Sequence, residues 1–125
     1  MTMRICAVAV KQVPSTLSRM DERLFIRELD KVMTPGRAWV VLDCSQIRQM
    51  DRAVIYLLLC CLEEAIKRDG NVKLAAISSD ARAVLKLAGV DRLFESFETN
   101  AEAIISFNQF PLVPASAAGL AGSPL

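Results

Sequence analysis

The feature that most constrains the fold is a long apolar helical segment with a short apolar run on each side. Residues 38–43 (AWVVLD) and 72–77 (VKLAAI) have strand length and almost no polar interruption. Such runs are typical of strands buried on both faces of a parallel sheet. Between them, Asp51 is a good N-cap for a helix that reaches about Arg68, and Gly70 is a plausible C-cap. The segment therefore predicts a strand, a crossover helix and a parallel strand.

Strands and helices alternate in the same way on both sides of this unit. The pattern predicts a strand at 4–13, a helix at 19–33, a helix from 79 to 88, a short strand within 92–97 and a helix at 100–107. The predicted fold is α/β: a mostly parallel sheet of four, or five, strands with packed helices. Residues 1–108 form a single domain in this prediction, and 109–125 are a tail rich in Pro, Ala and Gly.

Cap residues support these helix boundaries. Ser18 precedes the first helix, with Asp21 three residues later as a capping-box partner. Ser78 or Ser79 begins the third helix and Gly89 closes it, while Thr99 begins the last one. In a parallel sheet, function gathers where strand carboxyl ends meet helix N-termini. Here that edge contains residues 44–53 and 78–82.

Charge and hydropathy argue against binding to nucleic acid or insertion into a membrane. Residues 1–50 carry eight Lys/Arg and five Asp/Glu, and residues 51–125 carry seven and nine, so neither half has a clustered basic face. The longest apolar run, 53–62, is far shorter than the roughly 20 residues that span a bilayer. With no leader-like pattern at the start, we expect a cytoplasmic protein.

The residue types needed for catalysis or metal binding are scarce. The chain has no histidine, and its four cysteines have no CxxC spacing. A zinc site, a bound cofactor and His-dependent catalysis are therefore not expected, and neither is an enzyme. Free cysteines of this kind fit a reducing compartment, where they pack as small apolar residues.

Residues 40–104 resemble the STAS domain, which is named for sulphate transporters and anti-sigma factor antagonists. The family pattern has a buried strand ending in Asp-x-Ser, matched by Asp43 and Ser45, and an Asp that opens a leucine-rich helix, matched by Asp51. A "gG.v.L" strand, a helix closed by Gly and a "d.lf.if.t..eA" segment follow, all with counterparts here. The order and spacing of these motifs carry the resemblance.

The resemblance implies a regulatory protein-interaction module. In anti-sigma factor antagonists, the partner is a histidine-kinase-like ATPase that acts as the anti-sigma factor, and its phosphorylation of the second of two hydroxyl residues ends binding. Those two positions are Arg52 and Ala53 here, and the family glycine is Val54. Because the Ala53 side chain has no hydroxyl, the resemblance implies that this chain cannot be phosphorylated at the usual site.

The candidate partner surface surrounds this position and the start of the next helix. It comprises Gln49, Met50, Asp51, Arg52, Ala53, Val54, Tyr56, Ser78 and Ser79, extended by loops 15–19 and 78–80. Arg52 is either a solvated surface residue or a fixed positive contact for an acidic partner. Ser45, Ser78 and Ser79 are either loop and cap residues or substitute phosphate acceptors.

Three further alternatives stay open at this stage. Backbone amides at the start of the helix after Asp51 could bind a small ligand or a nucleotide phosphate. Some relatives are subunits of lipid-transport assemblies. Only one strand fits before the first helix, where the family usually has two, so the resulting open sheet edge calls for the tail or a second subunit in a homodimer to cover it.

Overall fold

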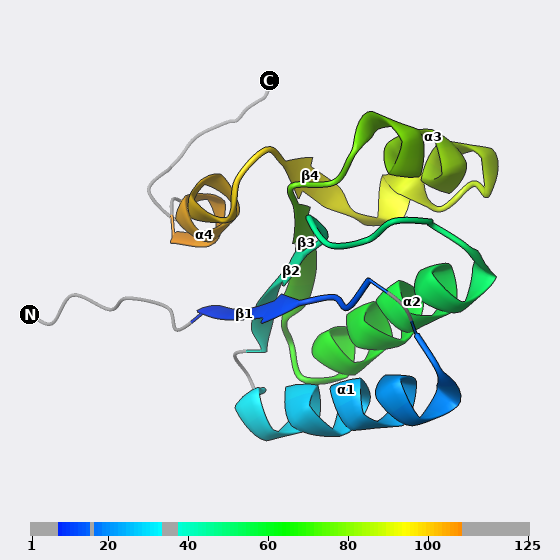
Figure 1. Ribbon diagram of the computed structural model, residues 1–125. Helices are drawn as coiled ribbons and strands as arrows, with labels where there is room; N and C mark the ends of the chain where they lie inside the picture. Colours follow the sequence, from blue (N-terminus) through cyan, green and yellow to red (C-terminus); the bar gives the residue numbers. More distant parts are fainter. Residues whose placement is uncertain (1–7, 16, 34–37, 109–125) are drawn as a thin grey trace, which may run out of the picture.

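The computed structural model describes residues 8–15, 17–33 and 38–108. The predicted start of the first strand, the turn at 34–37 and the tail lie outside these residues. The elements are β1 (Val8–Gln12), α1 (Arg19–Val32), β2 (Trp39–Asp43), α2 (Arg52–Lys67), β3 (Asn71–Ala75), α3 (Ser79–Leu87), a short 3-10 helix (Asp91–Leu93), β4 (Glu95–Phe97) and α4 (Asn100–Asn108) (Figure 1).

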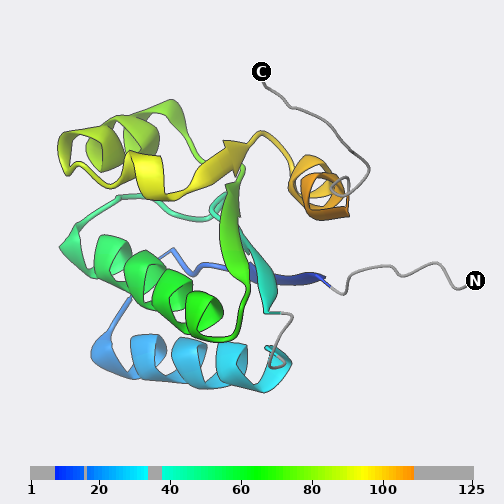
Figure 2. The ribbon, with the colours of Figure 1, turned by 180° about the vertical axis from the view of Figure 1, so that it is seen from behind.

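The four strands form one parallel sheet in the order β1-β2-β3-β4. Helices α1, α2 and α3 lie on one face of the sheet and α4 lies on the other (Figures 1 and 2). The predicted α/β class and parallel sheet are confirmed, and the described residues hold four strands.

Both faces of the central strands are covered, which explains their continuous apolar sequences. Val40 and Leu42 of β2 point into a large core that α2 completes with Leu57 and Leu58. Val41 points the other way, into a smaller cluster with Ala75, Ala103 and Phe107. Alternate residues of one strand thus belong to two different cores.

Lys73 is the one charged residue among the buried residues described, with 8% of its surface exposed. Its ammonium donates a hydrogen bond to Ser106 Oγ at 2.7 Å and lies 3.2 Å from a carboxylate oxygen of Glu95. It also lies 4.4 Å from the centre of the Phe107 ring. A buried charge needs such partners, and these contacts hold α4 against the sheet.

Gly70 does not have the role that the sequence predicted for it. Arg68 is the C-cap of α2, and Asp69 is the residue with positive φ, 59°. The N–H groups of Asp69 and Gly70 bond back to Ile66 and Ala65, as in a Schellman motif. Gly70 is required for space instead, because a Cβ there would lie 1.8 Å from the Ala38 carbonyl oxygen.

The other predicted caps are confirmed. Ser18 and Asp21 form a complete capping box, and the Thr99 hydroxyl accepts a hydrogen bond from the Glu102 N–H at 3.1 Å. Gly89 closes α3 with a φ of 77°.

The described cysteines are free thiols. Burial is the main cause that raises the pKa of Cys44 and of Cys61 to about 12, so both remain protonated packing residues at neutral pH.

Candidate functional site

The carboxyl edge of the sheet brings the starts of several helices together. Ladder hydrogen bonds continue one residue past the strand ends: Val13 N–H to Asp43 O at 2.9 Å, Cys44 N–H to Ala75 O at 2.8 Å, and Ala76 N–H to Phe97 O at 2.9 Å. The loops that lead into α1, α2, α3 and α4 therefore leave from adjacent points on this edge. This is the arrangement that the sequence predicted for the candidate surface.

The start of α2 is capped by Asp51, whose Oδ1 accepts a hydrogen bond from the Val54 N–H at 3.0 Å. The first turn that follows has no acidic residue. Arg52 is exposed, and Ala53 is partly exposed beside it. A positive charge at a helix N-terminus interacts unfavourably with the helix dipole, at a cost of about 0.3–1 kcal/mol. The charge of Arg52 therefore does not stabilise the helix.

The predicted contact residues divide into an outer and an inner group. Gln49, Asp51 and Arg52 are exposed, as is Tyr56 at 59%. Met50 and Val54 are only 5% and 3% exposed and pack in the large core. These two side chains hold the loop before α2 against the large core, so they are not accessible to a partner. We call Gln49, Asp51, Arg52, Ala53 and Tyr56 the α2 entrance.

The start of α3 is a second capped helix end on the same edge. Ser78 Oγ accepts a hydrogen bond from the Ala81 N–H at 3.1 Å. Ser78, Ser79 and Asp80 are all exposed, and Asp80 provides the negative charge in the first turn. Ser78 thus has the capping role, and Ser79 presents its hydroxyl from the first residue of the helix.

In the third loop segment, 15–19, the described residues also divide. Leu17 packs against the large core, whereas Ser18 and Arg19 are exposed at the start of α1. The exposed pair therefore adds polar and basic groups to this edge of the molecule.

Asp43 joins the loop before α2 to the start of α4. Its Oδ1 accepts a hydrogen bond from the Ser45 N–H at 2.9 Å, and its Oδ2 accepts one from Asn100 Nδ2 at 3.0 Å. Partial burial raises the pKa of this carboxyl, but the hydrogen bonds from Asn100 and Ser45 outweigh burial and leave its pKa below the ordinary value. The sequence indicated that Ser45 bonds within its own loop, but it did not predict the Asn100 contact, because Asn100 is 57 residues away along the chain.

Tyr56 extends the α2 entrance into a groove between α1 and α2. This groove has a volume of about 450 Å³, and its walls include Ile26, Tyr56, Cys60, Glu22 and Glu63. The pKa of Tyr56 is raised, first by a hydrogen bond with Cys60 and further by the nearby carboxylates. The tyrosine therefore stays neutral and offers an aromatic surface with a polar tip.

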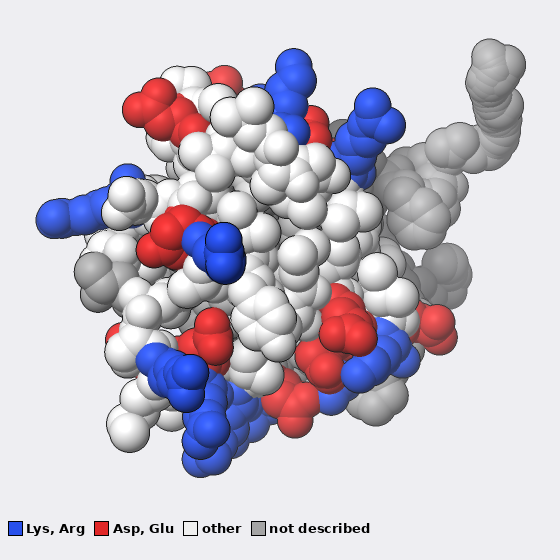
Figure 3. Space-filling view, turned by 90° about the vertical axis from the view of Figure 1, so that its right-hand side faces the viewer, with Lys and Arg blue, Asp and Glu red and all other residues white. Residues whose placement is uncertain are grey.

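Charged side chains of both signs surround an uncharged central area on the side of the molecule that lies to the right in Figure 1 (Figure 3). Within the described residues, no three His, Cys, Asp or Glu side chains come together as metal ligands. None of the helices in that part of the chain is long and apolar enough to cross a membrane.

Comparison with known proteins finds a matching family model and similar solved structures. The family model described as Mlab, STAS domain, matches residues 9–95. An anti-sigma-factor antagonist (STAS) domain protein from Planctomyces limnophilus has a similar structure, with a TM-score of 0.64 and 18% identity over 78% of this chain and 87% of that one. A candidate anti-sigma factor antagonist from Thermotoga maritima gives a TM-score of 0.62 and 18% identity, over 79% and 86% of the two chains. No curated protein matches the chain.

Proposed function

Because the chain belongs to the STAS domain family, we propose that it is a regulatory protein-interaction module of the anti-sigma factor antagonist type. Its partner in this proposal is an anti-sigma factor or another histidine-kinase-like ATPase protein, bound at the α2 entrance and the start of α3. The proposed binding is not ended by phosphorylation at the usual family position. We place this activity in the cytoplasm, and it requires neither catalysis nor a cofactor.

The observation that carries the proposal is the pair of side chains at the start of α2. Ala53 occupies the second helical residue, partly exposed at the edge where the loops gather, and it has no hydroxyl to accept a phosphate. In a switchable relative, a phosphate would bring about −1.5 to −2 charges to this point and disrupt a close interface. A methyl group keeps the entrance permanently uncharged at this position.

Arg52 gives the entrance a charge that selects its partner. The side chain is exposed, and it makes no ion pair with another residue in the described part of the chain. An exposed arginine that opposes the helix dipole and has no ion-pair partner among the described residues can pair with an acidic group on another protein. We therefore favour an acidic contact surface on the partner.

The test uses a purified histidine-kinase-like ATPase protein from the same genome, with binding measured by calorimetry. We expect Arg52→Ser to weaken binding by about tenfold, as for loss of a charge-assisted hydrogen bond of roughly 1.5 kcal/mol. Arg92→Ser, at an exposed arginine outside the α2 entrance, is the matched control and should leave binding unchanged. Equal effects of the two substitutions would show that the α2 entrance is not the contact site.

A small-ligand function is less well supported by the geometry. A phosphate at the start of α2 would need the Val54 N–H, which Asp51 already occupies, and it would face the Asp51 carboxylate. A thermal-shift screen with nucleotides and phosphate should show no stabilisation. A subunit of a lipid-transport assembly would use the same protein-binding surface, and binding to a transporter ATPase instead of a sigma-regulating kinase would identify it.

Homodimerisation through β1 is a separate proposal, based on the edge position of this strand in the described sheet. Val10 leaves 42% of its surface exposed there. Sedimentation should then show a dimer at high concentration. A monomer at every concentration, for the full chain and for one without residues 109–125, would exclude it.

A further inference from the structure

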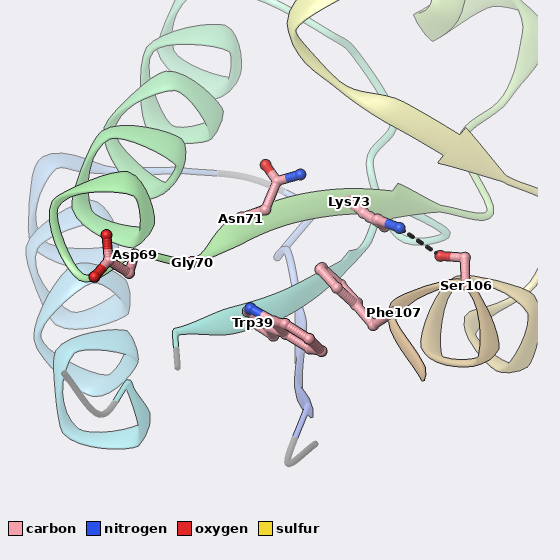
Figure 4. Close-up of a pocket in the computed structure, with 7 residues that line it drawn as sticks. All are labelled: Trp39, Asp69, Gly70, Asn71, Lys73, Ser106 and Phe107. Atoms are coloured by element: carbon pink, nitrogen blue, oxygen red, sulfur yellow. Dashed lines mark hydrogen bonds between the residues drawn. The ribbon is translucent and has the colours of Figure 1, made fainter. Parts of the chain in front are cut away.

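A second concave site lies at the opposite edge of the sheet from the α2 entrance. Its volume is about 230 Å³, and it is lined by Trp39, Asp69, Gly70, Asn71, Lys73, Ser106 and Phe107 (Figure 4). Trp39 and Asn71 are the first residues of β2 and β3, so this site lies at the amino ends of the strands. The proposed function uses none of these residues.

The walls combine an aromatic surface with hydrogen-bond donors. The rings of Trp39 and Phe107 are stacked, with their centres 5.2 Å apart and an angle of 18° between planes. Figure 4 shows Lys73 extending toward Ser106, next to Phe107. The Asn71 side chain accepts a hydrogen bond from the Val72 N–H through its oxygen, which leaves its NH₂ group directed to donate. Aromatic walls with a few donors suit an extended, proline-rich segment, whose carbonyl groups have few local partners.

The chain itself supplies such a segment next to the pocket. Phe107 forms one wall, and α4 ends one residue later at Asn108. The residues that follow, 110–114, read Phe-Pro-Leu-Val-Pro, and 109–125 carry no charge. Phe110 is three residues from the wall, within about 10 Å along an extended chain. The prolines at 111 and 114 have the PxxP spacing that favours a polyproline II conformation.

We propose that residues 110–114 dock in this pocket within the same chain, with Phe110 and Leu112 against Trp39 and Phe107. The backbone carbonyls accept hydrogen bonds from Asn71. The docked segment covers the small core between α4 and the sheet. This core lies on the opposite face of the sheet from α1, α2 and α3.

Trp39 is the only tryptophan of the chain, so its fluorescence reports directly on this pocket. The experiment compares the full chain with the double variant Phe110→Ser, Leu112→Ser. The matched control is Leu120→Ser, Leu125→Ser, which also replaces two apolar side chains by serine but lies beyond the docking segment. We expect the first variant to shift the Trp39 emission to longer wavelength and to increase its quenching by acrylamide. The control should match the parent chain.

A synthetic peptide of residues 109–114, added in excess to the first variant, should restore the parent emission. Circular dichroism of each variant checks that the fold is kept. Identical emission and quenching in both variants and the parent would overturn the proposal. A shift that appears in the parent on dilution would also overturn it, because the pocket would then hold this segment of a second copy.

Discussion

The starts of α2 and α3 are built alike up to the cap and then diverge. Each follows a central parallel strand, and in each the N-cap side chain accepts a hydrogen bond from the N–H three residues later, at 3.0 Å for Asp51 and 3.1 Å for Ser78. Beyond the cap, α3 continues with Ser79 and Asp80, whose charge suits a helix N-terminus. The first turn of α2 instead holds Arg52 and Ala53.

This difference is the basis on which we separate residues that serve folding from residues that we propose contact a partner. Helix α3 follows the local rules at its start and lies at the periphery, with Ala81 and Leu85 as its buried side chains. Helix α2 is buried along much of its length, yet it breaks the charge rule at its exposed end. Proteins break such rules mostly at functional sites, which is why we place the contact at the α2 entrance.

The largest difference between the two helices should appear in their cores. Leu58→Ala in α2 should lower the free energy of unfolding by about 4 kcal/mol, near the upper end for a buried leucine. Leu85→Ala in α3 should cost about 2–3 kcal/mol, because a peripheral helix can shift to fill the space. Urea unfolding measures both. An equal or larger loss for Leu85→Ala would show that α3 is as central as α2.

The next effect concerns how each helix ends. Gly70→Ala after α2 should cost about 3 kcal/mol, because the new Cβ meets the Ala38 backbone and the chain has to move. Gly89→Ala after α3 has open space and should cost only about 1–2 kcal/mol, for its positive φ. Thermal unfolding of both variants decides the order, and a milder Gly70→Ala would mean that the two backbones do not approach so closely.

The two caps should be equivalent within about 0.5 kcal/mol. Asp51→Ala and Ser78→Ala each remove one side-chain acceptor at a helix start and should each cost about 1 kcal/mol. Chemical denaturation with the same protocol tests this. If neither variant loses stability, the caps are not formed in solution. If only one variant loses stability, the two helix starts are not equivalent.

The smallest effect tests the first-turn charges. Arg52→Glu should stabilise the fold by about 0.3–1 kcal/mol, and Asp80→Arg should destabilise it by a similar amount. Both changes should shrink at high salt, where exposed charges are screened. Unfolding curves at low and high salt check the sign. A destabilising Arg52→Glu would mean that Arg52 supports the fold after all.

Much of this architecture was predictable because its determinants are local. Apolar runs, helical periodicity and cap residues such as Ser18 and Thr99 act within a few positions of the chain. The contacts that the sequence did not predict join segments that are distant along the chain. They are the Asp43–Asn100 hydrogen bond, the contact of buried Lys73 with Ser106, and the close approach of Gly70 to Ala38.

The sequence predicted that the candidate residues lie at the start of α2, but not which of them are exposed; their contact with a partner stays a prediction. The motif pattern placed it at the start of α2, because strand ends and helix starts can be read from the chain. The pattern could not distinguish Met50 and Val54, which turn inward, from Arg52 and Tyr56, which turn outward. That distinction depends on how the loop packs on the core, which the order of residues alone does not specify.

The most direct test of the proposed function is whether the complex with the proposed ATPase partner persists when ATP is added. The parent chain and the Ala53→Ser variant are each incubated with partner and ATP, and then followed by intact mass and by binding. The proposed function predicts that the parent gains no phosphate and stays bound, whereas the variant gains one phosphate and is released. A phosphate on the parent chain, at Ser45, Ser78 or Ser79, followed by its release, would contradict it.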